Sequence, residues 1–192
     1  MKSGSAALRS VRRQKEELRS ISGDEKEIES RFFAPLEFGT AGLRGTMCVG
    51  LHQMNIHVIR HATQAFAEVI LAEGPEAVKR GVAVCFDCRN HSQEFARETA
   101  GVMAGNGIPV RIFESLRPTP ELSFAVREYG CIAGVNVTAS HNPKEYNGYK
   151  VYWQDGAQLP PTTPRPSPRR WRSWTSSPPS SAWTTTRRWR RA

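Results

Sequence analysis

The residues of this chain that are best suited to chemistry lie in one short stretch, TASHNP at 138–143. This stretch follows an apolar run with the character of a β-strand, so its polar side chains fall at a strand end, outside the core. Pro143 lacks a backbone donor and biases the preceding residue, Asn142, away from the α region. We therefore expect Ser140 on an ordered loop, where a nucleophilic or phosphorylatable serine is usually displayed.

Basic residues elsewhere in the chain could surround that serine. Arg44 lies in the glycine-dense stretch GTAGLRG at 39–45, where glycines would let backbone N–H groups approach an anion and a guanidinium could bind phosphate through two hydrogen bonds. Lys150 follows an Asn-Gly pair at 147–148, which is typical of a hairpin turn and should bring the lysine ammonium near the Ser140 loop. Such a cationic pocket suits phosphoryl transfer.

Two other interpretations of the serine loop were considered. His141 could form a structural hydrogen bond that fixes the loop, or it could contact phosphate directly, and we weigh these two equally. A Ser–His–Asp hydrolase is the weaker interpretation of Ser140, because the sequence offers no committed carboxylate partner and no G-x-S-x-G elbow.

The elements that must position these residues alternate between helix and strand. We expect helices at 5–20, 24–33, 55–73, 94–104 and 121–129, with Ser22 or Asp24 capping the second and Asn55 the third. We expect strands at 82–86, 110–113, 131–137 and 149–153. This pattern predicts a three-layer α/β/α domain with a mostly parallel mixed sheet. The loops at 87–92, 117–120 and 138–143 should converge, because ligands bind at the carboxyl ends of strands in such sheets.

The positive charge of the chain is concentrated at one end. The formal net charge is +9, yet residues 160–192 hold eight arginines and no acidic residue, which leaves 1–159 nearly neutral with 19 basic and 18 acidic residues. We therefore divide the chain into an N-terminal helical segment at 1–37, an α/β/α domain at 38–159 and a disordered Arg/Pro/Trp-rich tail at 160–192.

The composition of the tail is typical of a GC-rich gene translated out of frame, and our hypothesis is a frameshifted or truncated product. A tail rich in arginine and tryptophan could instead bind nucleic acid or an anionic membrane. We favour a tail without function, because it lacks periodicity and has little apolar material to bury, and we do not expect nucleic acid as a partner.

The cysteines favour a buried role over a metal site. Cys85 and Cys88 form a C-x-x-C, which could be a redox or zinc half-site. No second C-x-x-C follows, and Cys85 ends an apolar run, so we favour a buried free cysteine. No stretch approaches the ~18 apolar residues of a membrane span. We expect a cytoplasmic protein with no membrane partner.

Three long motifs resemble the α-D-phosphohexomutase superfamily: FGTAGLRG at 38–45, RPTPELSFAVR at 117–127 and TASHNPKEYNGYKVY at 138–152. They are similar, in the right order, to the first domain of the phosphoglucomutase/phosphomannomutase branch, which includes phosphopentomutases. The resemblance implies an intramolecular phosphotransferase of carbohydrate metabolism that acts on sugar phosphates through a phosphoserine.

The resemblance also implies roles for individual residues. Ser140 would carry the phosphoryl group and bind Mg²⁺ through one phosphate oxygen, with a sugar 1,6-bisphosphate as activator and glucose, mannose or pentose phosphates as substrates. Arg44 and Lys150 would be its electrostatic and acid–base partners, with His141 as a neighbouring catalytic contact. The remaining site residues would be Thr138 and Asn142, which bind phosphate, and Asp87, Arg89 and Thr119, which support the site.

Motifs that the family places in its further domains do not occur in this sequence. These are the aspartate-rich Mg²⁺ loop, the sugar-specificity loop and the loop for the substrate's second phosphate. We therefore expect a domain I fragment that is inactive alone, because remote contacts position the substrate. The alternatives are a non-catalytic fragment whose basic tail binds nucleic acid, or a partner of a full-length mutase.

Overall fold

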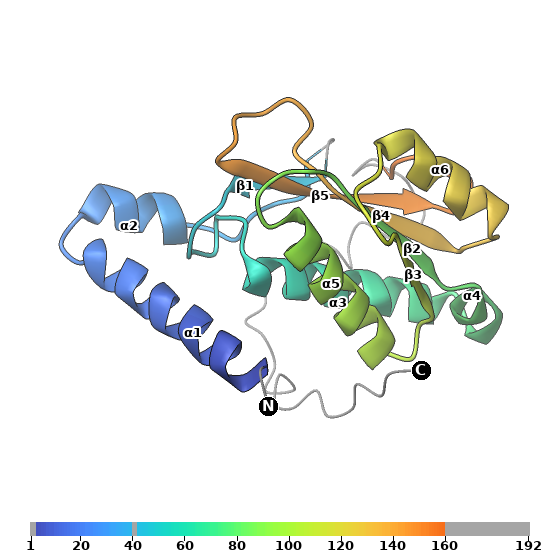
Figure 1. Cartoon of the computed structure of the whole chain (residues 1–192), viewed down its shortest axis with the longest axis horizontal. Helices are drawn as coiled ribbons and strands as arrows, with labels where there is room; N and C mark the ends of the chain where they lie inside the picture. Colours follow the sequence, from blue (N-terminus) through green and yellow to red (C-terminus); the bar gives the residue numbers. More distant parts are fainter. Residues whose placement is uncertain (1–2, 40–41, 160–192) are drawn as a thin grey trace.

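The computed structural model describes residues 3–39 and 42–159, which form a five-stranded sheet with helices on both faces (Figure 1). The predicted tail at 160–192 lies outside the described residues. The helices are α1 (Ser3–Ser20), α2 (Glu25–Phe32), α3 (Ile56–Ala72), α4 (Pro75–Arg80), α5 (Ser92–Gly105) and α6 (Thr119–Glu128). The strands are β1 (Leu43–Thr46), β2 (Val82–Phe86), β3 (Val110–Ile112), β4 (Ala133–Val137) and β5 (Tyr146–Trp153).

The sheet is mixed and mostly parallel, as the sequence predicted. Its strand order is β1-β5-β4-β2-β3. Strands β4, β2 and β3 are parallel neighbours, and β5 is antiparallel both to β4 and to β1. Four of the five strands therefore point in the same direction, and β5 alone is reversed.

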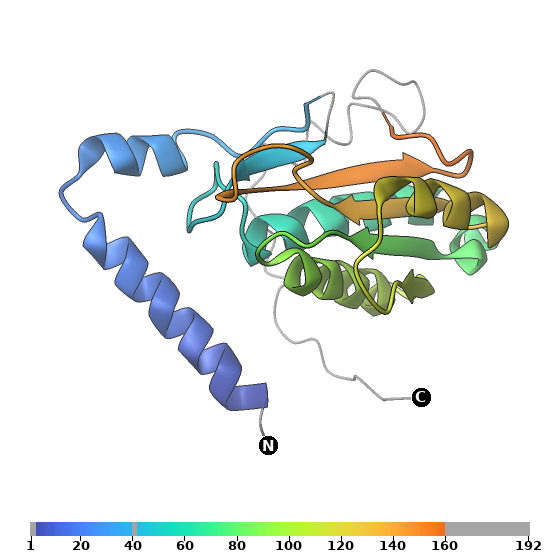
Figure 2. The same ribbon diagram turned by 45° about the horizontal axis from the view of Figure 1, so that its top comes forward.

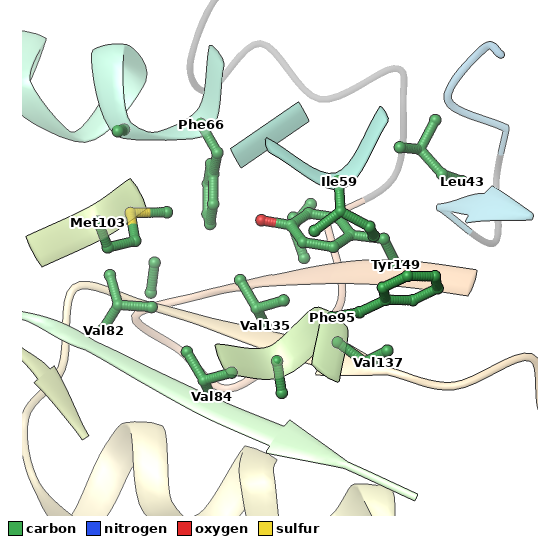
Figure 3. Packing of buried hydrophobic residues seen from close by; sticks show 14 of the residues in the cluster. Leu43, Ile59, Phe66, Val82, Val84, Phe95, Met103, Val135, Val137 and Tyr149 are labelled. Atoms are coloured by element: carbon green, nitrogen blue, oxygen red, sulfur yellow. The ribbon is translucent and has the colours of Figure 1, made fainter. Parts of the chain in front are cut away.

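Helices cover the two faces of the sheet unequally. Helices α3 and α5 pack against each other on one face, while α6 covers β2 and β4 on the other (Figures 1 and 2). All five residues of β2 are buried, as expected for a central strand covered on both sides. The larger core lies under α3 and α5, and Figure 3 shows Tyr149 of β5 there among residues of α3, α5 and β4. The smaller core lies under α6 and includes Leu122, Val126 and Tyr152.

Side-chain caps set the start of two predicted helices. Asp24 caps α2 by accepting a hydrogen bond from the Glu27 amide. Asn55 caps α3 by accepting from the amides of His57 and Val58, both at 3.1 Å. Its amide group also donates to the Gly50 carbonyl over 2.8 Å, which holds the preceding loop against the helix.

The two N-terminal helices lie to the side of the sheet near β1 (Figure 2), and Arg31 of α2 joins them to each other. Arg31 is 9% exposed and forms ion pairs with Glu17 of α1 at 2.6 Å and Glu27 of α2 at 2.7 Å. Glu17 also accepts a hydrogen bond from the Val49 amide at 2.8 Å. These contacts join α1 and α2 to the loop before α3.

The structure departs from the sequence predictions in two elements and one turn. Strand β1 and helix α4 were not predicted, so Arg44 lies on a strand instead of in a glycine-rich loop. The expected hairpin turn at 147–148 is wrong, because both residues lie inside β5 and pair with Gly45 and Arg44. The antiparallel neighbour β1 supplies strand partners for these residues, so the chain reversal falls instead in the loop at 138–145.

Among the described residues, no helix is both long and apolar enough to cross a membrane.

Candidate active site at the carboxyl ends of the strands

The loop that follows β4 turns sharply at Ser140. The Asn142 amide donates to the Ala139 carbonyl over 3.1 Å, and the Ser140 amide donates to Thr138 Oγ1 over 3.0 Å. Ser140 has a φ of +57°, in the left-handed region that non-glycine residues rarely adopt. Thr138 and Ala139 are buried, whereas Ser140 is exposed. The turn therefore presents the serine hydroxyl at the tip of an anchored loop.

The guanidinium of Arg89 fixes this loop through hydrogen bonds to its backbone carbonyl groups. Arg89 Nη2 donates to the carbonyl oxygens of Ser140 and Asn142, both at 2.6 Å. Arg89 Nη1 donates to the carbonyls of Pro143 at 2.9 Å and Tyr146 at 3.2 Å. One side chain from the loop after β2 thus binds four carbonyl groups, three in the serine loop and one at Tyr146, the first residue of β5.

Asp87 in turn orients Arg89. Its Oδ1 accepts a hydrogen bond from the Arg89 amide at 2.9 Å, and its Oδ2 lies 3.6 Å from Arg89 Nε. The Asp87 amide donates to the carbonyl of Val137, the last residue of β4, at 3.2 Å. The loops after β2 and β4 therefore meet, as expected for loops at the carboxyl ends of neighbouring parallel strands.

The third loop reaches the same end of the sheet. The Arg117 amide donates to the Phe86 carbonyl over 3.1 Å, and Thr119 Oγ1 accepts from Asn136 Nδ2 over 2.7 Å. Asn136 is a buried residue of β4, so Thr119 fastens the start of α6 to the strand that leads to Ser140. The loops at 87–92, 117–120 and 138–143 do converge.

Arg44 of β1 and Lys150 of β5 lie on the same face of the sheet as α6, which covers mainly β2 and β4. Leu43 and Tyr149 point into the larger core, so their chain neighbours Arg44 and Lys150 point to the opposite face. Arg44 Nη1 donates to Asn142 Oδ1 over 2.8 Å. Burial lowers the pKa of the Lys150 ammonium, the positive charge of Arg44 lowers it further, and the charge of Asp87 partly offsets both effects. Arg44 and Lys150 thus place two positive charges near each other on this face, and Arg44 reaches the serine loop at Asn142.

His141 is the sequence-predicted residue with the weakest connection to the site. Its Nδ1 lies 3.4 Å from Ser140 Oγ, which is long for a hydrogen bond that involves a hydroxyl. Its side chain is exposed.

The cysteines and the acidic residues do not form a metal centre within the part of the chain that the structure describes. No group of three or more His, Cys, Asp or Glu side chains there is arranged to hold a metal ion. Cys85 is buried and free, and burial raises the pKa of its thiol to about 11. Cys88 is free and exposed. The prediction of a buried free cysteine at 85 is confirmed.

Comparison with known proteins agrees with this geometry. Residues 35–165 match the family model described as phosphoglucomutase/phosphomannomutase, alpha/beta/alpha domain I. The chain belongs to this family. The match includes β1, the Asp87–Arg89 loop and the Ser140 loop.

Three similar proteins show how much of the family this chain spans. It is 41% identical over 143 residues to human phosphopentomutase, which corresponds to 71% of this chain and 23% of that protein. It is 42% identical over 137 residues to a phosphoglucomutase of Staphylococcus saprophyticus, covering 71% of this chain and 24% of that protein. A Thermus thermophilus crystal structure described as a phosphomannomutase superposes with a TM-score of 0.61 at 30% identity over 74% of this chain and 29% of that one. The chain thus spans about a quarter of the length of these relatives.

Proposed function

We propose that this chain carries the phosphoserine site of a phosphoglucomutase/phosphomannomutase-type enzyme, an intramolecular phosphotransferase that acts on sugar phosphates. The observation that carries the proposal is the placement of Ser140. Its side chain is exposed at the tip of a loop that Arg89 anchors, on the side of the sheet where Arg44 and Lys150 lie. Family membership and the names of the relatives support the same reaction class.

The chemistry assigned to the residues is phosphoryl exchange at the serine oxygen. In the loading step Ser140 Oγ forms a bond to a phosphorus atom of a sugar bisphosphate, and the bond between that phosphorus and the sugar oxygen breaks. The proton of the serine hydroxyl ends on the released sugar hydroxyl, so the products are phosphoserine and a sugar monophosphate. In the reverse step the phosphoserine transfers its phosphoryl group to the free hydroxyl of the other monophosphate isomer, which restores the serine hydroxyl and the bisphosphate, so that the net result is conversion of one sugar monophosphate into the other.

The surrounding side chains would stabilise the charge of the transferring group. Arg44 and Lys150 would interact with phosphate oxygens, and a Lys150 pKa below its ordinary value makes its proton easier to transfer. Thr138 and Asn142 would help bind phosphate, while Asp87, Arg89 and Thr119 would hold the loops in place. His141, with Nδ1 3.4 Å from Ser140 Oγ, would be a neighbouring catalytic contact of the serine.

Mg²⁺ and a sugar 1,6-bisphosphate belong to the proposal through the family. The described residues fit the metal poorly by themselves, because the charged side chains that bind the serine loop, Arg44 and Arg89, are cationic and no cluster of three potential ligands lies among the described residues. We therefore assign no step to the metal. Glucose, mannose and pentose phosphates are the proposed substrates. The proposed location is the cytoplasm, which microscopy of the tagged chain would test.

Incubation with glucose 1,6-bisphosphate and Mg²⁺, followed by mass analysis of the intact chain and its peptides, tests the function. We expect one phosphoryl group on Ser140 and none on the Ser140→Ala variant. Ser115→Ala, at an exposed serine in the loop between β3 and α6, is the matched control and should be phosphorylated like the unaltered chain. A chain that gains no phosphate, under conditions in which human phosphopentomutase does, contradicts an independent phosphoserine site.

A further inference from the structure

A buried series of hydrogen bonds links Asp87 to strand β5 and involves two residues, Ser92 and Asn147, to which the family resemblance assigns no site role. Ser92, the first residue of α5, and Asn147 of β5 are both 0% exposed. Asn147 Nδ2 donates to Ser92 Oγ over 3.0 Å and to the Asn90 carbonyl over 2.9 Å. Ser92 Oγ donates to Asp87 Oδ1 over 2.7 Å. The contacts run in one direction, from strand β5 to the aspartate.

These contacts close into a ring through Arg89. Asp87 Oδ1 accepts from the Arg89 amide, and Arg89 Nη1 donates to the carbonyl of Tyr146, which directly precedes Asn147. The ring therefore joins the loop after β2, the start of α5 and the start of β5. The same Arg89 holds the carbonyls of Ser140 and Asn142, so the ring and the serine loop share one guanidinium.

The polar side-chain atoms of Asn147 and Ser92 in this ring all have hydrogen-bond partners. Asn147 Oδ1 accepts from the Gly148 amide at 2.7 Å, while its Nδ2 has two acceptors, and Ser92 Oγ both donates and accepts. A buried network in which every member has a partner fixes one geometry, and the loss of a member leaves a buried group without a partner. The position of Arg89 relative to β5, and of the serine loop relative to Lys150 on β5, thus depends on Ser92 and Asn147.

We propose that Ser92 and Asn147 are positioning residues for phosphoryl transfer at Ser140, which they align with Lys150 by fixing Asp87 and Arg89. This inference rests on the proposed function for its kinetic consequence, while its structural consequence can be measured separately. The side-chain hydrogen bonds of Ser92 and Asn147 go to Asp87, Asn90, Gly148 and each other, so both residues act on Ser140 through Arg89.

The kinetic test uses Ser92→Ala and Asn147→Asp, the second of which keeps the size of the side chain but removes its donors. We expect the maximal rate constant of Ser140 phosphorylation by glucose 1,6-bisphosphate to fall about tenfold in each variant, with a change below about threefold in the half-saturating donor concentration. A defect confined to folding would lower the fraction of phosphorylated chains and leave the rate constant of the folded ones unchanged.

Double variants test the route through Arg89. In an Arg89→Ala background, Ser92→Ala should slow phosphorylation by less than about twofold further, because residues that act through a shared partner are not additive. Thr99→Val is the control, since it removes a buried hydroxyl from α5 about two turns beyond Ser92 and should leave the rate constant unchanged. Equal slowing by Ser92→Ala in both backgrounds, or a comparable effect of Thr99→Val, overturns the inference.

Hydrogen exchange separates this inference from the proposed function. In Ser92→Ala and Asn147→Asp, the amides of Ser140 and Asn142 should exchange about tenfold faster or more, whereas those in β2 and β4 and all amides of Thr99→Val should not. If the unaltered chain takes up no phosphate, the proposed function fails and this measurement still decides the positioning role. Unchanged exchange in the serine loop of both variants would overturn the positioning role. If Asn147→Asp does not fold, Ser92→Ala alone decides the test.

Discussion

Arg44 and Asn142 are 98 positions apart in the sequence, and Arg44 Nη1 donates to Asn142 Oδ1 over 2.8 Å. The contact joins the edge strand β1 to the loop that presents Ser140. It also means that two residues proposed to bind phosphate are hydrogen-bonded to each other. An arriving phosphate must therefore compete with Asn142 for the guanidinium, and the strength of this contact should tune anion binding.

Asn142→Asp should weaken the binding of glucose 1,6-bisphosphate by about tenfold, because a carboxylate binds Arg44 more strongly than an amide does and adds negative charge beside the site. Isothermal titration calorimetry measures the dissociation constant. Asn142→Ala is the control, as it removes the competing oxygen without adding charge, and should bind the bisphosphate more tightly than Asn142→Asp. Equal affinity of the two variants would show that the contact does not influence binding.

The pKa of Lys150 should lie below its ordinary value of 10.5, and should rise in Arg44→Gln, because this change removes one of the two causes that lower it. Asp87→Asn should lower it further, since the carboxylate stabilises the ammonium. NMR titration of the lysine side chain measures the three values. The Lys150 pKa should be lowest in Asp87→Asn, intermediate in the unaltered chain and highest in Arg44→Gln. Any other order contradicts this electrostatic account.

The same shift has a consequence for stability. Because the folded pKa lies below the unfolded one, the unfolded chain binds more protons between the two values, and the free energy of unfolding gains from Lys150 as the pH rises through that window. Lys150→Met removes the ionisable group. The free energy of unfolding of the unaltered chain should therefore rise relative to that of Lys150→Met as the pH rises toward 10.5, as measured by urea unfolding at several pH values. A difference independent of pH would contradict a lowered pKa.

The left-handed backbone at Ser140 predicts an unusual order of stability for two substitutions. Both Ser140→Ala and Ser140→Gly remove the hydroxyl, but only glycine adopts a φ of +57° without strain. Ser140→Gly should be as stable as Ser140→Ala or more stable by up to about 1 kcal/mol in chemical unfolding, despite the extra entropy of glycine in the unfolded chain.

Ser30 provides the reference for this comparison, because it is exposed in helix α2. There glycine should be less stable than alanine by roughly 1 kcal/mol. The same order at both positions would mean that the Ser140 turn relaxes to an ordinary backbone conformation in solution.

Local patterns predicted most elements of the fold, because capping residues and apolar periodicity act within a few positions. Asp24 and Asn55 cap α2 and α3, as the sequence predicted. Helix α4 was not predicted, although it begins at Pro75 and proline suits the first position of a helix. Strand β1 is only four residues long and contains glycine, which is depleted in strands.

Contacts between distant segments explain what the sequence did not predict about the site. The Asn-Gly pair at 147–148 favours a turn locally, yet Asn147 is buried and bound to Ser92 and Asn90, which are 55 and 57 positions away. Arg89 was expected to support the site, but its four carbonyl partners lie 51 to 57 positions along the chain. Pairing with β1 and the ring around Arg89 together override the local preference for a turn.

Gly148 should tolerate no side chain, because a Cβ there would lie 2.6 Å from the Thr138 carbonyl oxygen and 2.9 Å from that of Leu43. Both atoms belong to backbone, so β5 would have to move away from β1 and from the base of the serine loop. We expect Gly148→Ala to lower the free energy of unfolding by about 2 kcal/mol or more, as strain in a packed interior does. Urea unfolding measures this loss.

Gly105 is the matched control for that substitution. It ends α5, a Cβ added there would meet no described atom within 4 Å, and alanine should stabilise the chain or leave its stability unchanged. Because Thr138 also accepts from the Ser140 amide, the displacement caused by Gly148→Ala should reach the serine and slow its phosphorylation, whereas Gly105→Ala should not. A Gly148→Ala chain that is as stable and as readily phosphorylated as Gly105→Ala would contradict the close packing of β5 against the serine loop.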